Sequence, residues 1–292
     1  MPASPRRRAF GQHFLRDEKV IAKIVATTFE FVEKHSARAL LEIGPGKGAL
    51  TSPLLAAAKT APGIERFQIV EKDRNLAADW IDQTRGAERV EVIEADFLDL
   101  ECERYLGHAP LIIVSNLPYS AGTAILQELA RFPREIPAMV LMFQAEVAAR
   151  LRAAPGDKAW GSLSLWIQNR WDVKRLLAVP PGAFIPPPDV NSEIVVMEAR
   201  ARLRVPCPPC PNPEFNEKWL SDWESNWEKL IRIPFLHRRK MLRSGLPKDS
   251  IWKEALEAAG IDGTRRAEDL EWSDWEKWLT AVQARTFKFN HS

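Results

Sequence analysis

The chain has 292 residues, of which 46% are hydrophobic and 27% charged, and its formal net charge at pH 7 is +2. These values are ordinary for a soluble globular protein with one large domain or two unequal ones. They exclude a polycation, so any affinity for nucleic acid must come from local patches, and three cysteines are too few for a disulfide scaffold.

Neither a secretory signal nor a membrane span is predicted. The N-terminal stretch "MPASPRRRAFGQHF" is basic but is not followed by an apolar segment. The longest uncharged run, residues 105–127, contains Pro110, Asn116 and Pro118, which fit a strand, a turn and a helix instead of a span. We therefore expect a cytoplasmic protein that makes no membrane contact.

Strands and helices are predicted to alternate through the first 200 residues. The spacing of apolar residues predicts helices over 17–34, 49–58, 75–84, after 121 and over 145–151. Apolar runs predict strands over 39–44, 66–73, 90–100, 110–120, 137–144, 171–179 and 192–200. This order predicts an α/β fold with a mostly parallel sheet, in which ligands bind at the carboxyl ends of the strands.

The character of the sequence changes after about Arg204. We predict one domain over residues 1–204, a linker "VPCPPCPNP" over about 205–213, and a small helical domain over 214–292. Seven of the 11 tryptophans follow the linker. Three of them, Trp219, Trp223 and Trp227, are four residues apart, which favours a packing seam over a base-stacking surface.

The C-x-x-C spacing of Cys207 and Cys210 allows a redox pair or half of a zinc site. No second pair of ligands lies near them in the sequence, and the segment is proline-rich. We favour a linker with reduced thiols and predict no metal.

The stretch "LEIGPGKGALT" places glycines after a predicted strand, where the backbone can approach a ligand closely. It also fits the looser G-x-G-x-x-A dinucleotide fingerprint, so a nicotinamide enzyme is an alternative. Glu42, two residues before the first glycine, suits a cationic group such as the amino acid part of S-adenosylmethionine. Glu71 and Asp96, at two further strand ends, could hold ribose hydroxyls and an adenine amine.

The stretch "SNLPYS" follows the fourth predicted strand. A plain reading is a tight turn whose Tyr119 packs on the core. The alternative is a pocket for an adenine amine, whose lone pair is delocalised into the ring. Acceptors aimed at the amine protons, Asn116 Oδ1 and a carbonyl of Leu117 or Pro118, would make that nitrogen more nucleophilic, while Tyr119 stacks on the base.

Seven segments in order resemble the ribosomal RNA adenine dimethyltransferases of the KsgA type: "FGQHFL", "LEIGPGKGALT", "VEKD", "EADFLD", "SNLPYS", "MFQAEVAARL" and "FIPPPDVNS". The similarity covers residues 6 to about 200 and continues in "FLHRRKMLRSGL", residues 235–246. It implies a class I (Rossmann-like) methyltransferase with a mostly parallel seven-stranded sheet, a small α-helical C-terminal domain, and S-adenosyl-L-methionine as cofactor.

The resemblance also implies roles for particular residues. The expected cofactor-binding residues are His13, Leu15, Gly44, Glu71, Asp96 and Asn116. The expected catalytic residues are Asn116, Leu117, Pro118, Tyr119 and Phe184. Tyr119 and Phe184 would flank the target adenine, although Phe184 could equally be a core residue before the proline loop; we favour the pocket wall.

Two basic runs flank the predicted core. Their members expected to bind RNA are Arg6, Arg7, Arg8, Arg238, Arg239 and Lys240. A charge run is usually a solvated face, but two runs beside a methyltransferase core favour contact with phosphates.

We therefore predict an enzyme that dimethylates the N6 amines of two adjacent adenosines near the 3′ end of 16S rRNA, in an immature small subunit. The protein is expected to act as a monomer. The alternatives are a large-subunit methyltransferase of the macrolide-resistance type, a non-catalytic assembly factor that keeps the fold, and the nicotinamide enzyme. Leu117 and the segment 235–246 argue against the first alternative.

Overall fold

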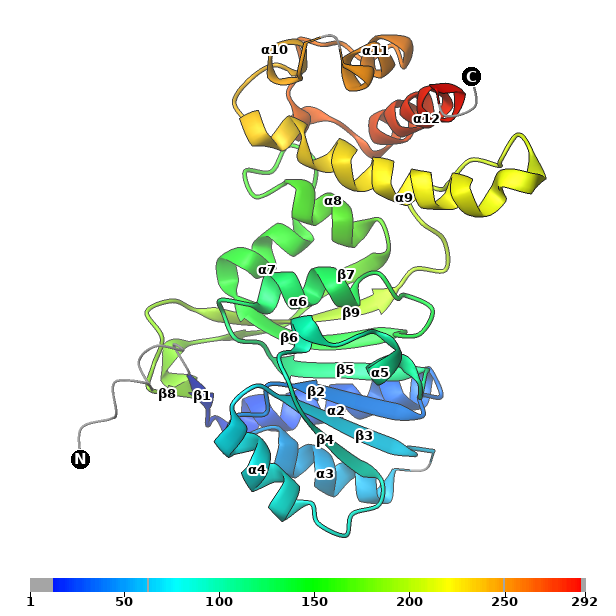
Figure 1. Cartoon of the computed structure of the whole chain (residues 1–292). Coiled ribbons are helices and arrows are strands. Elements are labelled where there is room, and N and C mark those ends of the chain that lie inside the picture. The colour runs from blue at the N-terminus through cyan, green and yellow to red at the C-terminus, as the bar shows by residue number, and fades with distance from the viewer. Residues whose placement is uncertain (1–12, 62, 249, 290–292) are drawn as a thin grey trace. The chain divides into compact units, whose positions relative to one another are not determined.

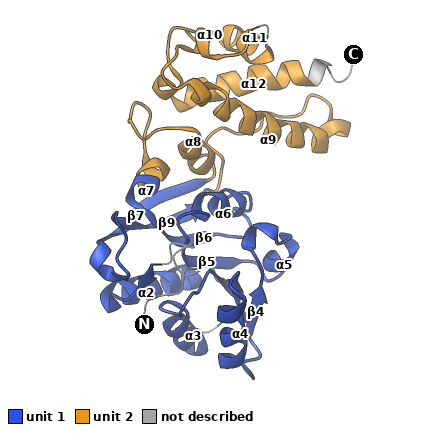
Figure 2. Cartoon of the chain, turned by 60° about the vertical axis from the view of Figure 1, so that its left-hand side comes forward, with its two compact units in different colours: residues 1–148, 171–200 blue, residues 149–170, 201–292 orange. Residues whose placement is uncertain are grey.

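The computed structural model of the chain describes residues 13–61, 63–248 and 250–289. The chain divides into two compact units (Figure 2). Unit 1 comprises residues 1–148 and 171–200, and unit 2 comprises residues 149–170 and 201–292.

Unit 1 is built on a seven-stranded sheet, seen in Figure 1. The strand order is β4 (Val90–Glu94), β3 (Arg66–Glu71), β2 (Ala39–Ile43), β5 (Leu111–Asn116), β6 (Ala138–Gln144), β9 (Ser192–Ala199) and β7 (Trp171–Val179). The strands from β4 to β6 are parallel, and β9 is antiparallel to both of its neighbours. The predicted α/β fold with a mostly parallel seven-stranded sheet is confirmed.

The central strands are covered on both faces. All five residues of β2 and the first five of β5 are buried, as expected for apolar strands in the middle of a parallel sheet. Their register places Ala39 between Arg66 of β3 and Leu111 of β5, so the ends of the three strands lie at the same edge.

Helices connect the strands of unit 1 close to the predicted positions. They are α2 (Glu18–Lys34), α3 (Thr51–Thr60), α4 (Arg74–Gln83), α6 (Gly122–Leu129) and α7 (Ala145–Arg152). A short helix that was not predicted, α5 (Glu103–Leu106), lies between β4 and β5. Two predicted strands are too long: the strand expected over 90–100 ends at Glu94, and the strand expected over 110–120 ends at Asn116. Asp96 accepts a hydrogen bond from Leu98 N and starts the short turn Phe97–Asp99, so the chain leaves the sheet there.

A second, two-stranded sheet was not predicted. Strand β1 (Phe14–Leu15) pairs antiparallel with β8 (Phe184–Ile185). We call residues 13–16 the strap. Arg16 N donates to Ala183 O at 2.8 Å, which extends this pairing by one hydrogen bond.

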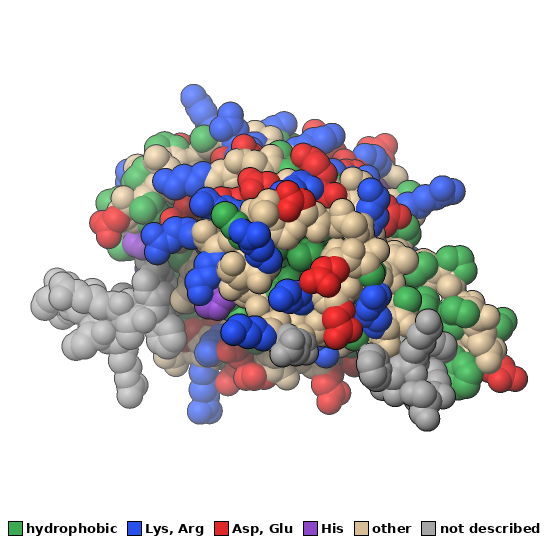
Figure 3. Space-filling view, turned by 90° about the horizontal axis from the view of Figure 1, so that it is seen from above, with side chains coloured by type: hydrophobic (Ala, Val, Ile, Leu, Met, Phe, Trp, Pro, Cys, Tyr) green, Lys and Arg blue, Asp and Glu red, His purple; other side chains and the backbone are tan. Residues whose placement is uncertain are grey.

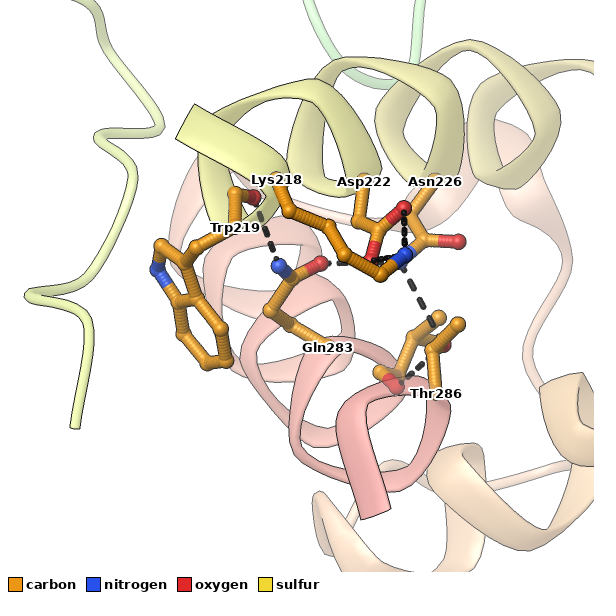
Figure 4. A network of polar contacts seen from close by, with 7 residues as sticks. Lys218, Trp219, Asp222, Asn226, Gln283 and Thr286 are labelled. Atoms are coloured by element: carbon orange, nitrogen blue, oxygen red, sulfur yellow. Dashed lines mark hydrogen bonds and ion pairs between the residues drawn. The ribbon is translucent and has the colours of Figure 1, made fainter. Parts of the chain in front are cut away.

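Unit 2 is helical, as predicted. It contains α8 (Ser162–Gln168), α9 (Asn216–Arg232), α10 (Leu242–Gly245), α11 (Ile251–Ala258) and α12 (Trp272–Phe289). Trp219, Trp223 and Trp227 of α9 are all buried, which confirms that they form a packing seam. Helices α9 and α12 also share a buried amide pair, in which Asn226 Nδ2 donates to Gln283 Oε1 at 2.8 Å (Figure 4).

The compact units and the predicted domains differ in the segment 149–170, which groups with unit 2. Within unit 2, Asn169 Oδ1 accepts from Val205 N at 2.7 Å, and Trp219 Nε1 donates to Pro208 O at 2.7 Å. These bonds attach the proline-rich stretch to α8 and α9. The boundaries at 204 and 214 remain a prediction about separately folding domains.

Cys207 and Cys210 are free, half-buried thiols. Burial raises the pKa of Cys207 to about 11, which disfavours the reactive thiolate. In the ranges that the structure describes, no group of three or more His, Cys, Asp and Glu side chains is arranged to hold a metal ion. Within the same ranges no helix is both long and apolar enough to cross a membrane.

Candidate active site

The glycine loop after β2 has a backbone that requires glycine. Gly44, Gly46 and Gly48 all have positive φ, between 55° and 84°. A Cβ on Gly48 would lie 2.3 Å from the ring of Trp80 in α4, and Trp80 Nε1 donates to Gly46 O at 3.0 Å. The loop is therefore held against α4, leaving its other side for a ligand.

Glu71 ends β3 beside this loop. Its carboxylate is only 6% exposed, and it accepts from Gly46 N at 3.1 Å and from Asp73 N at 2.8 Å. Each carboxylate oxygen retains a further lone pair. Glu71 therefore fixes the loop and keeps the capacity to accept hydroxyl protons from a ligand.

Asp96 follows β4, the next strand along the edge. Its Oδ2 accepts from Lys72 Nζ at 2.5 Å and its Oδ1 from Leu98 N at 3.1 Å. The Lys72 hydrogen bond, followed by the Leu98 amide, lowers the pKa of Asp96. Asp96 is thus an ionised acceptor. Sequence reasoning did not assign Lys72 as its partner, although it lies within the "VEKD" segment.

Glu42 lies under the glycine loop and is 2% exposed. Burial raises its pKa to about 8; the nearby Thr51 side chain opposes this shift, and the charge of Glu71 adds to it. At neutral pH the carboxyl is predominantly protonated. The use of Glu42 as the anionic partner of a cationic group stays a prediction, because a bound cation would itself lower this pKa.

Replacing Glu42 with glutamine tests this environment. The pKa is 4.5 when the group is exposed and about 8 in the folded chain. Stability from the protonated carboxyl is therefore present below about pH 4.5 and lost as the pH rises to about 8. Between pH 5 and pH 8 we expect the wild type to lose about 2–4 kcal/mol more unfolding free energy than Glu42→Gln, as measured by urea unfolding. Parallel pH curves would contradict this expectation, and the exposed Glu94→Gln serves as the control.

The strap lies against the glycine loop. A Cβ on Gly46 would come within 3.1 Å of the Phe14 ring, and Lys47 Nζ lies 4.9 Å from the centroid of that ring. On its other side the strap contacts the proline loop, with His13 Nδ1 2.8 Å from Pro186 O. Leu15 is buried in the hydrophobic core of unit 1.

The "SNLPYS" loop adjoins the glycine loop, since a Cβ on Gly44 would lie 3.9 Å from Pro118 Cδ. Asn116 Nδ2 donates to His13 O at 3.5 Å, and within the described part of the chain no donor is bonded to its Oδ1. The Pro118 carbonyl accepts from Ala121 N at 3.1 Å and Gly122 N at 2.8 Å. Of the two carbonyls considered from the sequence, that of Leu117 is therefore the one left for a substrate amine.

Tyr119 is half-buried, and its hydroxyl lies 2.6 Å from Ser192 Oγ. Burial raises the pKa of Tyr119, with the Ser192 hydrogen bond acting the other way, so the side chain is a neutral phenol. Beside Tyr119 is a small pocket whose lining residues are Leu117, Pro118, Tyr119, Gly122, Thr123, Phe143, Gln144 and Val147.

Phe184 lies in the core, whereas the sequence favoured a place on the pocket wall. Its ring is 2% exposed and belongs to the core cluster that also contains Leu15, Val179 and Ile194. The structure thus shows the core-residue alternative. A role for Phe184 beside the target base remains a prediction.

The sequence matches the model of a family described as ribosomal RNA adenine dimethylase over residues 3–283. The chain belongs to this family. A protein named ribosomal RNA small subunit methyltransferase A from Syntrophotalea carbinolica is 34% identical, with 96% of this chain and 97% of the relative aligned. A protein of the same name from Acinetobacter baylyi is 38% identical, with 90% of this chain and 88% of the relative aligned.

Solved structures of the same fold include a dimethyladenosine transferase from Plasmodium falciparum, with a TM-score of 0.66 and 21% identity. That match covers 95% of this chain and 98% of the other. The 23S rRNA methyltransferase ErmE has a TM-score of 0.61 and 24% identity, over 92% of this chain and 99% of the other. Family membership confirms the predicted S-adenosylmethionine-dependent transfer of methyl groups to rRNA adenines, and the nicotinamide alternative is wrong.

The predicted RNA-binding residues of this dimethylase family member have different surroundings. Arg6, Arg7 and Arg8 lie outside the described residues. Arg238 is half-buried in unit 2; its Nε donates to Glu268 Oε2 at 2.7 Å and its Nη2 to Asp157 O at 3.5 Å.

Close to Arg238 in the sequence, Arg239, Lys240 and Arg243 are exposed, and they form no ion pair with any residue that the structure describes. We call these three residues the free basic triad. Figure 3 shows a face of unit 2 on which Lys and Arg side chains are numerous, with acidic side chains among them. Within the described ranges none of the three is ion-paired as Arg238 is, although Arg243 lies close enough to Asp262 to contribute to the lowered pKa of that carboxyl.

Proposed function

We propose that this family member transfers methyl groups to the N6 amines of two adjacent adenosines near the 3′ end of 16S rRNA, in an immature small subunit. We further propose that it acts as a cytoplasmic monomer. The observation that carries the proposal is the contact between the Gly44 loop and Pro118, which puts a cofactor-type loop beside two amine acceptors. The curated relatives at 34% and 38% identity, named as small-subunit methyltransferases, support the choice of rRNA.

The residues at the sheet edge fit S-adenosylmethionine. Apart from its chain neighbours, no described residue has an atom closer than 3.9 Å to where a Cβ on Gly44 would lie, and Glu71 and Asp96 present carboxylates beside neighbouring strand ends. We propose that His13, Leu15, Gly44, Glu71, Asp96 and Asn116 hold it, with Glu71 on the ribose and Asp96 on the adenine. When bound, the cofactor supplies an electrophilic methyl group on a sulfonium.

The chain's own contribution is to make the adenine amine a better nucleophile. Asn116 is oriented by its Nδ2 bond to His13 O, so its Oδ1 can accept one amine proton. The Leu117 carbonyl accepts the other, which draws the nitrogen toward tetrahedral geometry. Tyr119 is a neutral phenol and serves for stacking, not as a base. The product amine loses its proton readily once the methyl group has moved, so no strong base is needed.

A methyl-transfer assay with labelled S-adenosylmethionine tests the proposal. The substrates are unmethylated small subunits, large subunits and naked rRNAs, and modified adenines are mapped as stops of reverse transcription. We expect dimethylated adenines near the 3′ end of 16S rRNA. Transfer only to large-subunit RNA would favour the resistance-type alternative, and cofactor binding without transfer would favour an assembly factor.

Glu71→Ala is expected to weaken the affinity for S-adenosylmethionine by about 1–3 kcal/mol, the usual cost of losing hydrogen bonds to a charged group. Part of this loss will come from the glycine loop, because Gly46 N loses its acceptor. Isothermal titration calorimetry measures the affinity, and thermal unfolding of the cofactor-free protein reports the loop contribution. Asp82→Ala, an exposed carboxylate of α4, is the control, and an unchanged Glu71→Ala affinity would remove Glu71 from the ribose site.

A further inference from the structure

The Tyr119 hydroxyl connects the loop after β5 to β9, the strand next to one edge of the sheet. The hydroxyl lies 2.6 Å from Ser192 Oγ, across 73 residues of sequence. The distance is at the short end of the range for O–H···O hydrogen bonds. The rest of the Tyr119 side chain is half-exposed, and its ring lies 5.7 Å from the His13 ring at an interplanar angle of 32°, without stacking on it.

Ser192 is a rigid anchor for this bond. It is 1% exposed and is the first residue of β9, where it pairs with Gln144 of β6 on one side and Val179 of β7 on the other. The preceding residue is also fixed, because Asn191 O accepts from Ala145 N at 2.9 Å. The Ser192 hydroxyl therefore has a defined position, whereas Tyr119 belongs to a loop.

A stacking surface must hold its ring in a defined position. In the proposed function Tyr119 stacks on the target adenine, while Asn116 and Leu117 of the same loop receive its amine protons. A shift of about 1 Å in the base would misplace the amine relative to both acceptors. Packing alone leaves the far end of a half-exposed ring free to shift, whereas a hydrogen bond at the hydroxyl holds that end in place.

We propose that Ser192 is a positioning residue for methyl transfer, whose hydroxyl fixes the far end of the Tyr119 ring and so the place at which the target adenine stacks. This inference rests on the proposed function. It assigns a task in substrate alignment to a residue that contacts neither cofactor nor target base.

The test compares Ser192→Ala, Tyr119→Phe and the double variant in single-turnover methyl transfer at saturating cofactor. Each single variant removes the same hydrogen bond and is expected to lower the rate by about 3- to 10-fold. The double variant is expected to be no slower than the slower single variant, because the bond can be lost only once. The affinity for S-adenosylmethionine is expected to stay within about 2-fold.

A second readout separates ring positioning from general stability. An RNA with 2-aminopurine at the target position reports stacking of the extruded base by fluorescence quenching. Weaker quenching is expected in both single variants. Thr28→Val is the control: it removes another buried hydroxyl of unit 1, one that donates to Ile24 O at 2.8 Å in α2, and it should leave quenching unchanged.

Wild-type rate and quenching in Ser192→Ala would overturn the inference, as would two independent losses that multiply in the double variant. If Ser192→Ala fails to fold, Tyr119→Phe still decides the question. It removes the same hydrogen bond by deleting the hydroxyl of the half-exposed partner and leaves the buried Ser192 unchanged. Failure of the proposed function is distinguishable, since the wild-type protein would then label no adenine of 16S rRNA.

Discussion

Asn116→Ala is expected to lower the single-turnover rate of methyl transfer by about 100-fold or more, at saturating cofactor and RNA. The side chain supplies one of two acceptors for the adenine amine, and its Oδ1 is oriented by the bond from Nδ2 to His13 O. Removing a pre-oriented group of this kind affects the transition state more than the ground state. The affinity for S-adenosylmethionine should change by no more than several-fold.

The assay is rapid quench with labelled cofactor, together with calorimetric titration of the cofactor. Asn75→Ala, an exposed asparagine of α4, is the control and should keep the wild-type rate. Normal turnover in Asn116→Ala would disprove the amine-positioning role. A large loss of cofactor affinity with an unchanged rate at saturation would make Asn116 a cofactor residue only.

The parts of the site that follow strand ends were predictable from the sequence. Glycines, acids and the "SNLPYS" turn each come directly after an apolar run, and parallel strands bring such ends to one edge. The register of β2, β3 and β5 accounts for that juxtaposition. Local pattern and chain order were sufficient, because neighbouring parallel strands share a direction.

The parts that depend on pairing across long sequence separations were not predictable. Nothing in "HFL" or "FI" indicates that Phe14 and Ile185 are partners in a two-stranded sheet. The burial of Phe184 follows from that pairing, because it packs beside Leu15. A sequence pattern also gives no sign that Lys72 neutralises Asp96, since exposed lysines are common beside strand ends.

The sequence also does not show which basic residues of a run have ion-pair partners. From the sequence, Arg238, Arg239 and Lys240 are equivalent members of one run. The structure separates them, because Arg238 pairs with Glu268 and contacts Asp157 O, whereas its two neighbours are exposed. An ion-paired, half-buried arginine contributes to the packing of unit 2, and its positive charge is already compensated.

Replacing the free basic triad, Arg239, Lys240 and Arg243, with alanine is therefore expected to weaken RNA binding strongly. If each residue neutralises one phosphate, the slope of log K against log salt should become shallower by about 2 to 3. At 0.1 M salt this corresponds to a loss of affinity of about 100-fold or more. Filter binding of small-subunit RNA between 50 and 300 mM KCl measures both quantities.

A matched control distinguishes phosphate contact from net charge. Replacing Lys19, Lys23 and Lys59, exposed lysines of α2 and α3, removes the same three charges from unit 1 and should leave the slope nearly unchanged. Arg238→Ala should instead lower the thermal stability of the protein with little effect on the slope, because Glu268 loses its 2.7 Å ion pair with Arg238 and keeps only the 3.7 Å pair with Arg266. If the triad variant keeps the wild-type slope, the phosphates are bound elsewhere. Equal effects of the triad and control variants would mean that RNA responds only to the overall charge of the chain.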